Sequence, residues 1–224
     1  RPLFDDGTPP IMIQPRLSGL RLDAWMQQNR AQFKSWIDER GAVLLRGFDI
    51  ADERALLRLL TSVGVVPMDY RYRSTPRREI ESRIYSSTEY PAPEKIPQHH
   101  ENAYTTRYPE LLWFACLDDR FTGGCTPLSD GAEVHSRLDS AIRDEFIARG
   151  LRYLRRYDNR VDLSWQDTFQ TSERSDVEAA CAERGIECTW LDDGTLETRQ
   201  SAQVRIHHPV SGHEIWFNQA HLFF

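Results

Sequence analysis

Two turn sequences in the C-terminal third constrain the fold of this chain most strongly. Asp192-Asp193-Gly194 contains an Asp-Gly pair, which is a strong hairpin signal between strand-like runs, and Pro209-Val210-Ser211-Gly212 is a second turn of the same kind. The strand-like runs that flank these turns cover residues 187–191, 195–199, 204–208 and 214–218. This part of the chain is therefore predicted to form two antiparallel hairpins.

The remaining sequence mixes helical and strand patterns. Apolar residues at helical spacing predict helices over residues 22–40, 52–63 and 132–148, and Gly41 is well placed to end the first. Further strands are predicted over residues 42–48, 80–85, 96–101, 111–117, 126–128 and 151–157. Many short strands with helices toward one end indicate an α+β fold, a double-stranded β-helix (jelly-roll) barrel with flanking helices. Since no repeat or linker interrupts the pattern, we expect one domain over residues 1–224.

Composition excludes several classes of function. The formal charge of -6 and the lack of a long Lys/Arg run argue against a nucleic-acid-binding protein. No apolar run approaches the roughly 20 residues of a membrane span, and the N-terminus lacks the character of a signal peptide. The four cysteines lack Cys-x-x-Cys spacing, so we expect reduced thiols. A soluble, cytoplasmic protein with no membrane partner is the resulting expectation.

One stretch carries residues with metal-binding chemistry. Gln98-His99-His100-Glu101-Asn102-Ala103-Tyr104 begins on a predicted strand, where His99 and Glu101 would share one face while His100 points to the other. With a third ligand, one histidine and one carboxylate would complete the facial triad that binds Fe(II). A short motif also occurs by chance, and the alternative is a polar run on a solvated strand.

Several segments together resemble the taurine dioxygenase/TfdA group of Fe(II)- and 2-oxoglutarate-dependent oxygenases, in particular its clavaminate-synthase-like and SyrP-like members. The matching segments occur in family order and span nearly the whole chain. They are Arg46-Gly47-Phe48, Ser87-Thr88-Glu89-Tyr90-Pro91, the stretch from Gln98 to Tyr104, Gly123-Gly124-Cys125-Thr126-Pro127-Leu128-Ser129-Asp130, and the stretch from His208 to Phe223.

The resemblance implies a role for individual residues. His99 is similar to the first iron-ligating histidine and Glu101 to the ligating carboxylate, while Thr126 resembles the threonine that holds a carboxylate oxygen of 2-oxoglutarate. Asn102 follows the ligand and is expected either to touch cosubstrate or substrate or to hold the loop. Related halogenases carry a small residue in place of the carboxylate, so the presence of Glu101 favours hydroxylation.

The resemblance also implies two elements beyond Phe224, a distal histidine as third iron ligand and an arginine that binds 2-oxoglutarate. We therefore expect the single oxygenase domain of residues 1–224 to lack its C-terminal segment. Among the histidines present, His221 is the best substitute for the third ligand, followed by His207 and His208. His135 and His213 are interpreted as ordinary surface histidines.

The function implied is hydroxylation of an unactivated C–H bond in an amino acid or an amino-acid-derived substrate, free or tethered to a carrier protein, with release of succinate and CO2. Arg71, Arg73, Arg77 and Arg78 are interpreted first as a solvated basic face and second as a contact for an anionic substrate or carrier. Two alternatives remain: a catalytically silent oxygenase-like binding module, and a cupin-type metal enzyme that does not use 2-oxoglutarate. The oligomeric state has no signal in the sequence.

Overall fold

The computed structural model describes residues 3–70, 72, 74, 77–81, 83–87, 93–158 and 163–223. The chain divides into two compact units. Unit 1 comprises Arg1–Met68, Glu79–Tyr85 and Trp113–Gly124, and unit 2 comprises Asp69–Arg78, Ser86–Leu112 and Cys125–Phe224. Within the described ranges, none of the helices combines the length and apolar character needed to span a membrane.

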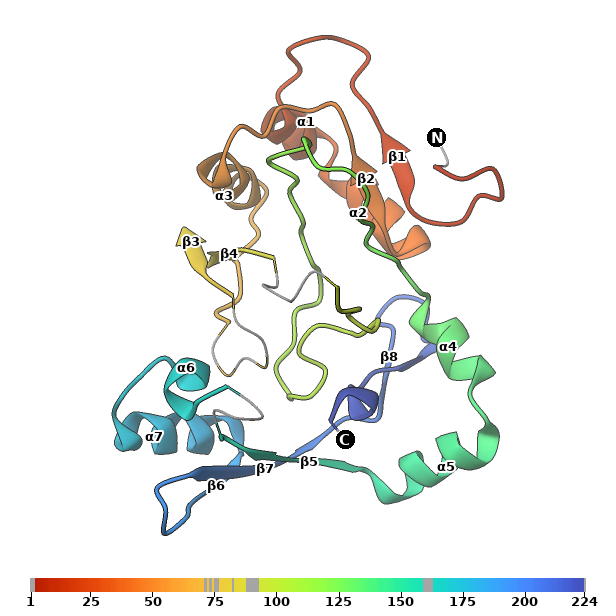
Figure 1. Ribbon diagram of the computed structural model, residues 1–224. Coiled ribbons are helices and arrows are strands. Elements are labelled where there is room, and N and C mark those ends of the chain that lie inside the picture. Colours follow the sequence, from red (N-terminus) through yellow and green to blue (C-terminus); the bar gives the residue numbers. More distant parts are fainter. Residues whose placement is uncertain are drawn as a thin grey trace. The chain divides into compact units, whose positions relative to one another are not determined.

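Unit 1 is built from helices packed beside two small sheets (Figure 1). Strands β1 (Ile11–Ile13) and β2 (Val43–Leu45) pair in parallel, and β3 (Glu79–Glu81) pairs antiparallel with β4 (Ile84–Tyr85). The helices are α1 (Leu22–Gln28), α2 (Arg30–Arg40) and α3 (Glu53–Ser62). Their apolar faces form a core of Leu22, Met26, Phe33, Leu56, Leu59, Leu60 and Val63.

Local signals in the sequence explain where these helices begin and end. The side chain of Asp52 accepts a hydrogen bond of 2.6 Å from the backbone N–H of Ala55 and so caps the start of α3. Gly41, with a φ of 72°, ends α2 in the left-handed conformation. The helix predicted over residues 22–40 is divided at Asn29, whose side-chain amide donates to the carbonyl of Trp25 at 2.8 Å.

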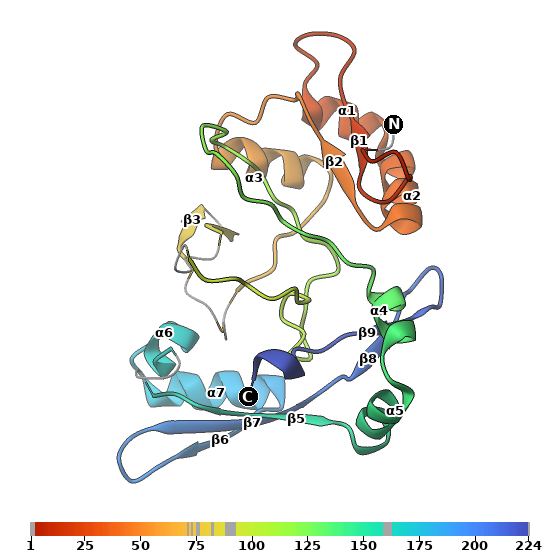
Figure 2. The same ribbon diagram turned by 45° about the vertical axis from the view of Figure 1, so that its right-hand side comes forward.

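Unit 2 contains a three-stranded antiparallel sheet in the order β5 (Leu151–Arg156), β7 (Leu196–Ala202) and β6 (Glu187–Trp190). Helices α6 (Trp165–Phe169) and α7 (Arg174–Arg184) and the 3-10 helix η1 (Ala220–Leu222) lie on one side of this sheet (Figure 2). A second hairpin joins β8 (Arg205–His207) to β9 (Glu214–Trp216). Both predicted hairpins are therefore confirmed.

Aromatic side chains fill the space between the large sheet and the segments that cover it. Tyr72, Tyr104, Tyr153, Tyr157 and Phe169 are all buried in one cluster. The end of the chain packs here as well, because the ring of Phe223 lies 4.9 Å from that of Tyr153 and 5.6 Å from that of Tyr104. The C-terminal segment is thereby fixed beside the turn that follows Glu101.

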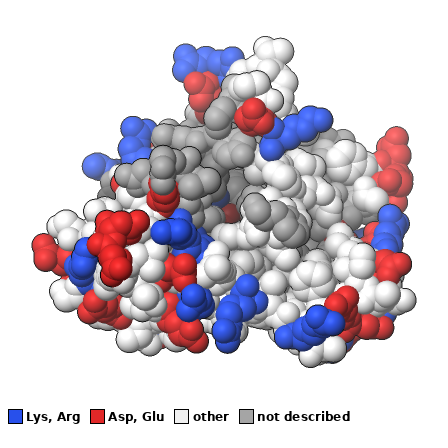
Figure 3. All heavy atoms as spheres, turned by 60° about the horizontal axis from the view of Figure 1, so that its bottom comes forward, with Lys and Arg blue, Asp and Glu red and all other residues white. Residues whose placement is uncertain are grey.

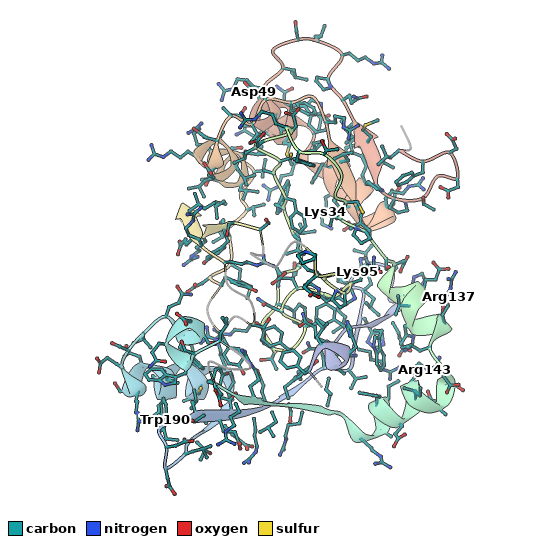
Figure 4. The ribbon with its side chains drawn as sticks, in the orientation of Figure 1. Lys34, Asp49, Lys95, Arg137, Arg143 and Trp190 are labelled. Atoms are coloured by element: carbon teal, nitrogen blue, oxygen red, sulfur yellow. The ribbon has the colours of Figure 1, made fainter. Side chains whose placement is uncertain are left out.

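Charged side chains of both signs lie on the protein surface. On the face seen in Figure 3, basic and acidic side chains are interspersed among uncharged ones. Ion pairs on β7 and its neighbours show the same mixing, with Arg199 Nη2 2.6 Å from Glu197 Oε1 and Arg156 Nη2 3.8 Å from Asp193 Oδ2. Trp190, labelled in Figure 4 on β6, has the guanidinium of Arg174 4.4 Å from its ring centroid.

Several predicted elements are wrong. Residues 96–101, 111–117 and 126–128 form no strand. The run 111–117 was assigned from its apolar content, yet it finds no partner strand among the described residues, and Phe114 is 73% exposed. The helix predicted over residues 132–148 is two helices, α4 (Gly131–Arg137) and α5 (Ser140–Arg149), because Leu138 is extended and Asp139 caps α5 by accepting from the N–H of Ala141. The described residues thus form a mixed α+β structure with four small sheets.

Candidate functional site

The candidate metal ligands lie at a tight turn in unit 2. An extended segment reaches His100, and residues 101–104 form the turn. Asn102 has a φ of 55°, and its carbonyl accepts from the N–H of Thr105 at 3.0 Å. The amide of Gln203 donates to the carbonyls of Ala103, at 2.8 Å, and Thr105, at 3.0 Å, so the turn is attached to the chain just after β7.

Remote side chains, rather than a neighbouring strand, bind the segment that leads to the turn. The carbonyl of Gln98 accepts from His221 Nε2 at 3.1 Å, and the carbonyl of His100 accepts from Gln219 Nε2 at 2.5 Å. Pro97 has no N–H to offer a strand partner. These contacts explain why the predicted strand over residues 96–101 does not form.

His99 is exposed and oriented through one ring nitrogen. Its Nδ1 lies 2.8 Å from the carbonyl oxygen of Pro97, which can only accept, so the proton is assigned to Nδ1. The lone pair then belongs to Nε2, which makes no hydrogen bond within the described residues. Metal-binding histidines are commonly fixed in this way by a backbone carbonyl. His99 therefore has the tautomer and exposure required of a ligand.

Glu101 is held through one carboxylate oxygen. Arg77 Nη2 donates to Glu101 Oε2 at 2.9 Å, and the side chains of Arg77 and Glu101 are only 19% and 13% exposed. Oε1 of Glu101 has no hydrogen-bond donor in the part of the chain that the structure describes. The interpretation of Arg77 as part of a solvated face is wrong, whereas Arg78 is exposed. Arg71 and Arg73 lie outside the described residues, as do residues 88–91 of the family-like segment.

His100 is partly buried and packs into the unit, whereas His99 is exposed. Its ring centroid lies 4.7 Å from that of Phe217, and an added Cβ on Gly131 would come within 3.1 Å of its Nε2. Burial lowers the pKa of His100, and the nearby His99 ring lowers it further, against a hydrogen bond with the backbone of Trp216. His100 is consequently neutral near pH 7 and fixes the turn against the hairpin of β8 and β9.

Thr126 lies on an exposed loop after two glycines with left-handed backbones, Gly123 at φ 78° and Gly124 at φ 80°. The glycines form the predicted turn without the predicted strand. Ser129 connects this loop to the ligand segment, since its hydroxyl donates to Gln98 Oε1 at 2.7 Å. The loop that carries Thr126 is thus attached one residue before His99.

Asn102 is 5% exposed, and its Oδ1 is buried without a hydrogen-bond donor among the described residues. Its backbone carbonyl holds the turn through Thr105. This contact is made by the backbone and does not decide between the two roles expected for the Asn102 side chain. The amide oxygen remains an acceptor beside the candidate ligands.

The other histidines occupy distinct environments. His221 contacts the ligand segment, but its Nε2 is directed to the carbonyl of Gln98. His207 Nε2 lies 3.5 Å from Glu214 Oε1, and His208 Nδ1 accepts from the N–H of Ser211. His135, interpreted as a surface residue, is buried, with its Nε2 3.6 Å from Glu214 Oε2. The interpretation of His135 is wrong because α4 packs directly on β9.

These donors have the chemistry expected of part of an iron site. An imidazole nitrogen and a carboxylate oxygen are ligand types that suit Fe(II), and each ligand retains one atom for a metal. No group of three His, Cys, Asp or Glu side chains able to hold a metal ion occurs within the described ranges. The residues therefore fit two of the protein ligands of a facial triad.

Comparison with known proteins gives an independent result. A family model described as "Taurine catabolism dioxygenase TauD, TfdA family" matches residues 4–223. The dapdiamide synthesis protein DdaC of Enterobacter agglomerans is 40% identical over 187 residues, which are 84% of this chain and 57% of the relative. A clavaminate synthase-like protein of Arabidopsis thaliana is 28% identical over 225 residues, covering 94% of this chain and 68% of the relative. The chain thus spans somewhat more than half the length of the first of these relatives.

Proposed function

Because the chain belongs to the taurine catabolism dioxygenase TauD, TfdA family, we propose that it is an Fe(II)- and 2-oxoglutarate-dependent dioxygenase. The family also implies a jelly-roll barrel, which we propose as the architecture of the complete protein. Fe(II) with 2-oxoglutarate supplies the oxidising power for C–H hydroxylation, while the protein supplies binding, orientation and exclusion of water.

One observation on this chain supports the proposal that its family membership suggests. His99 is held through Nδ1 by Pro97 and Glu101 through Oε2 by Arg77, so each presents one remaining donor atom, Nε2 and Oε1. His99 lies on the extended segment and Glu101 begins the turn two residues later, and both side chains are fixed by a hydrogen bond. This arrangement supports His99 and Glu101 as two protein ligands of the iron.

Thr126 is proposed to bind a carboxylate of 2-oxoglutarate. Its loop is attached beside His99 through Ser129 and Gln98, and the exposed Thr126 hydroxyl is a neutral donor for such a ligand. Asn102 is proposed to contact substrate or cosubstrate. Its buried Oδ1, which lacks a protein donor among the described residues, can accept from an N–H or O–H group of the substrate. A contact with 2-oxoglutarate, which has only acceptor oxygens, would use the amide N–H groups of Asn102 instead.

The proposed substrate is a small amino acid or an amino-acid-derived molecule, free or tethered to a carrier protein. One similar protein is named for dapdiamide synthesis, which supports a small-molecule substrate. Glu101 resembles the ligating carboxylate of the family, which supports hydroxylation as the outcome. The products besides the hydroxylated substrate are succinate and CO2.

The test is succinate formation from 2-oxoglutarate on addition of Fe(II) and ascorbate to the protein at its full natural length. We expect turnover in the unmodified protein, loss of turnover in His99→Ala, and retention in His213→Ala, which changes an exposed histidine outside the site. Equal succinate formation by His99→Ala would refute the assignment.

A second candidate is a catalytically silent oxygenase-like binding module. It is favoured by the lack, within the described ranges, of a third side chain that joins His99 and Glu101 in a metal-binding group. Binding of 2-oxoglutarate without any succinate formation would identify this function. Metal-dependent turnover that needs no 2-oxoglutarate would instead indicate a cupin-type enzyme.

A further inference from the structure

We propose that Arg77 is a positioning residue for the metal-binding carboxylate of Glu101. By holding Oε2, its guanidinium presents Oε1 to the metal and restricts Glu101 to binding through a single oxygen. This inference rests on the proposed function, since it concerns the same carboxylate. It assigns a role to a residue that lies 24 positions before Glu101 and outside the His-x-Glu motif.

The contact is a partly desolvated ion pair. The 2.9 Å distance joins Arg77 Nη2 to Glu101 Oε2, and less than a fifth of either side chain is exposed. The guanidinium also lies 5.0 Å from the ring centroid of the buried Tyr70. Packing on a ring limits the positions open to the guanidinium, so the pair differs from a surface salt bridge between two mobile side chains.

Tyr72, which precedes Arg77 in the sequence, is attached to the ligand turn. The N–H of Tyr72 donates to the carbonyl of Thr168 at 3.1 Å, and the hydroxyl of Tyr104 donates to the carbonyl of Tyr72 at 2.8 Å. Tyr104 closes the same turn that begins at Glu101. The turn that carries the acceptor of the Arg77–Glu101 pair is therefore anchored to the cluster of buried tyrosines, and the donor packs on the buried Tyr70.

Two effects of opposite sign act on metal affinity. The positive guanidinium repels a metal cation, whereas the hydrogen bond fixes the carboxylate in the orientation that the metal needs. Loss of a hydrogen-bonding partner behind a metal ligand typically weakens metal binding about 10- to 100-fold. We propose that orientation dominates, because the carboxylate is largely buried and Arg77 contacts Oε2, which leaves Oε1 without a donor among the described residues.

The test is equilibrium binding of Mn(II), a redox-stable substitute for Fe(II), to the protein at its full natural length. We expect Arg77→Gln to weaken Mn(II) binding about 10- to 100-fold. Arg77→Lys keeps the positive charge and an N–H donor, so it is expected to recover part of the Mn(II) affinity that Arg77→Gln loses. If Arg77 only stabilised the fold, Mn(II) affinity would not depend on a donor at this position. The matched control is Arg78→Gln, which removes the same charge from an exposed neighbour and should bind within about twofold of the unmodified protein.

The inference is overturned if Arg77→Gln binds Mn(II) as tightly as Arg78→Gln, or more tightly, which would mean that repulsion dominates. It is also overturned if Arg77→Lys binds no better than Arg77→Gln while both variants keep the unfolding temperature of the control. Failure of the proposed function has a different signature, namely Mn(II) binding that His99→Ala leaves unchanged. Binding that requires His99 but ignores Arg77 would refute this inference alone.

Discussion

Replacement of Gly131 by alanine tests the packing that fixes the ligand turn. A Cβ at this first residue of α4 would lie 2.5 Å from Ile215 Cγ2 and 3.1 Å from His100 Nε2. Carbon atoms pack best about 3.5–4.0 Å apart, so the Ile215 side chain, α4 or β9 must move by roughly 1 Å. Overpacking of this kind costs about 1–3 kcal/mol, while Gly→Ala gains about 0.4–1 kcal/mol by restricting the unfolded chain.

The net expectation for Gly131→Ala is a loss of about 1–2 kcal/mol, equivalent to a fall in Tm of about 2–8 °C for a chain of this size. Thermal and urea unfolding of the variant measure it. In an Ile215→Ala background, which removes Cγ2, the added methyl group should cost much less, and this double-mutant cycle isolates the contact. A Gly131→Ala protein as stable as the unmodified one, or more stable, would refute the close approach of α4 to β9 and His100.

Two further predictions concern parts of the chain away from the ligand turn. Asp52→Ala should destabilise unit 1 by about 1 kcal/mol, because it removes the cap on the N–H of Ala55. The control, Asp49→Ala, should change the free energy of urea unfolding little. Equal losses of stability in the two variants would contradict the capping role. Burial raises the pKa of Cys181 to about 12, so its thiol stays protonated near pH 8. Cys181 should therefore resist alkylation by iodoacetamide at that pH, while the exposed Cys116 should react. Mass spectrometry of the alkylated native protein measures this, and modification of both thiols at one rate would contradict the burial.

The parts of the fold that could be predicted depend on short-range signals. Asp192-Asp193-Gly194 determines a hairpin through the backbone preferences of three residues, and Gly194 has the left-handed φ of 82° that the turn needs. Asp52 and Gly41 end helices for equally local reasons. These elements are confirmed because no distant residue is needed to specify them.

The environment of the candidate ligands depends on residues far away in the sequence. The predicted strand over residues 96–101 fails because Gln219 and His221, more than 100 positions later, bind the carbonyls that a partner strand would bind. Pro97 was a visible signal against this strand. Arg77 carried no comparable signal, since neither its spacing from Glu101 nor its arginine-rich surroundings distinguish a buried ion pair from a solvated face.

The family resemblance identified His99, Glu101, Thr126 and Asn102 as candidates, and the family itself is confirmed by the match over residues 4–223. Their individual roles remain predictions. The structure adds the way in which His99 and Glu101 are held, by Pro97 and Arg77. Periodicity alone would have placed both candidate ligands on a strand, and that geometric reason is incorrect because no strand forms there.

The most direct test of the central claim is a crystal structure of the protein at its full natural length, loaded anaerobically with Fe(II) and 2-oxoglutarate. We predict one iron bonded to Nε2 of His99 and to Oε1 of Glu101, with Arg77 still on Oε2. Iron bound elsewhere, or His99 and Glu101 side chains that diverge and leave the metal to other residues, would contradict the claim.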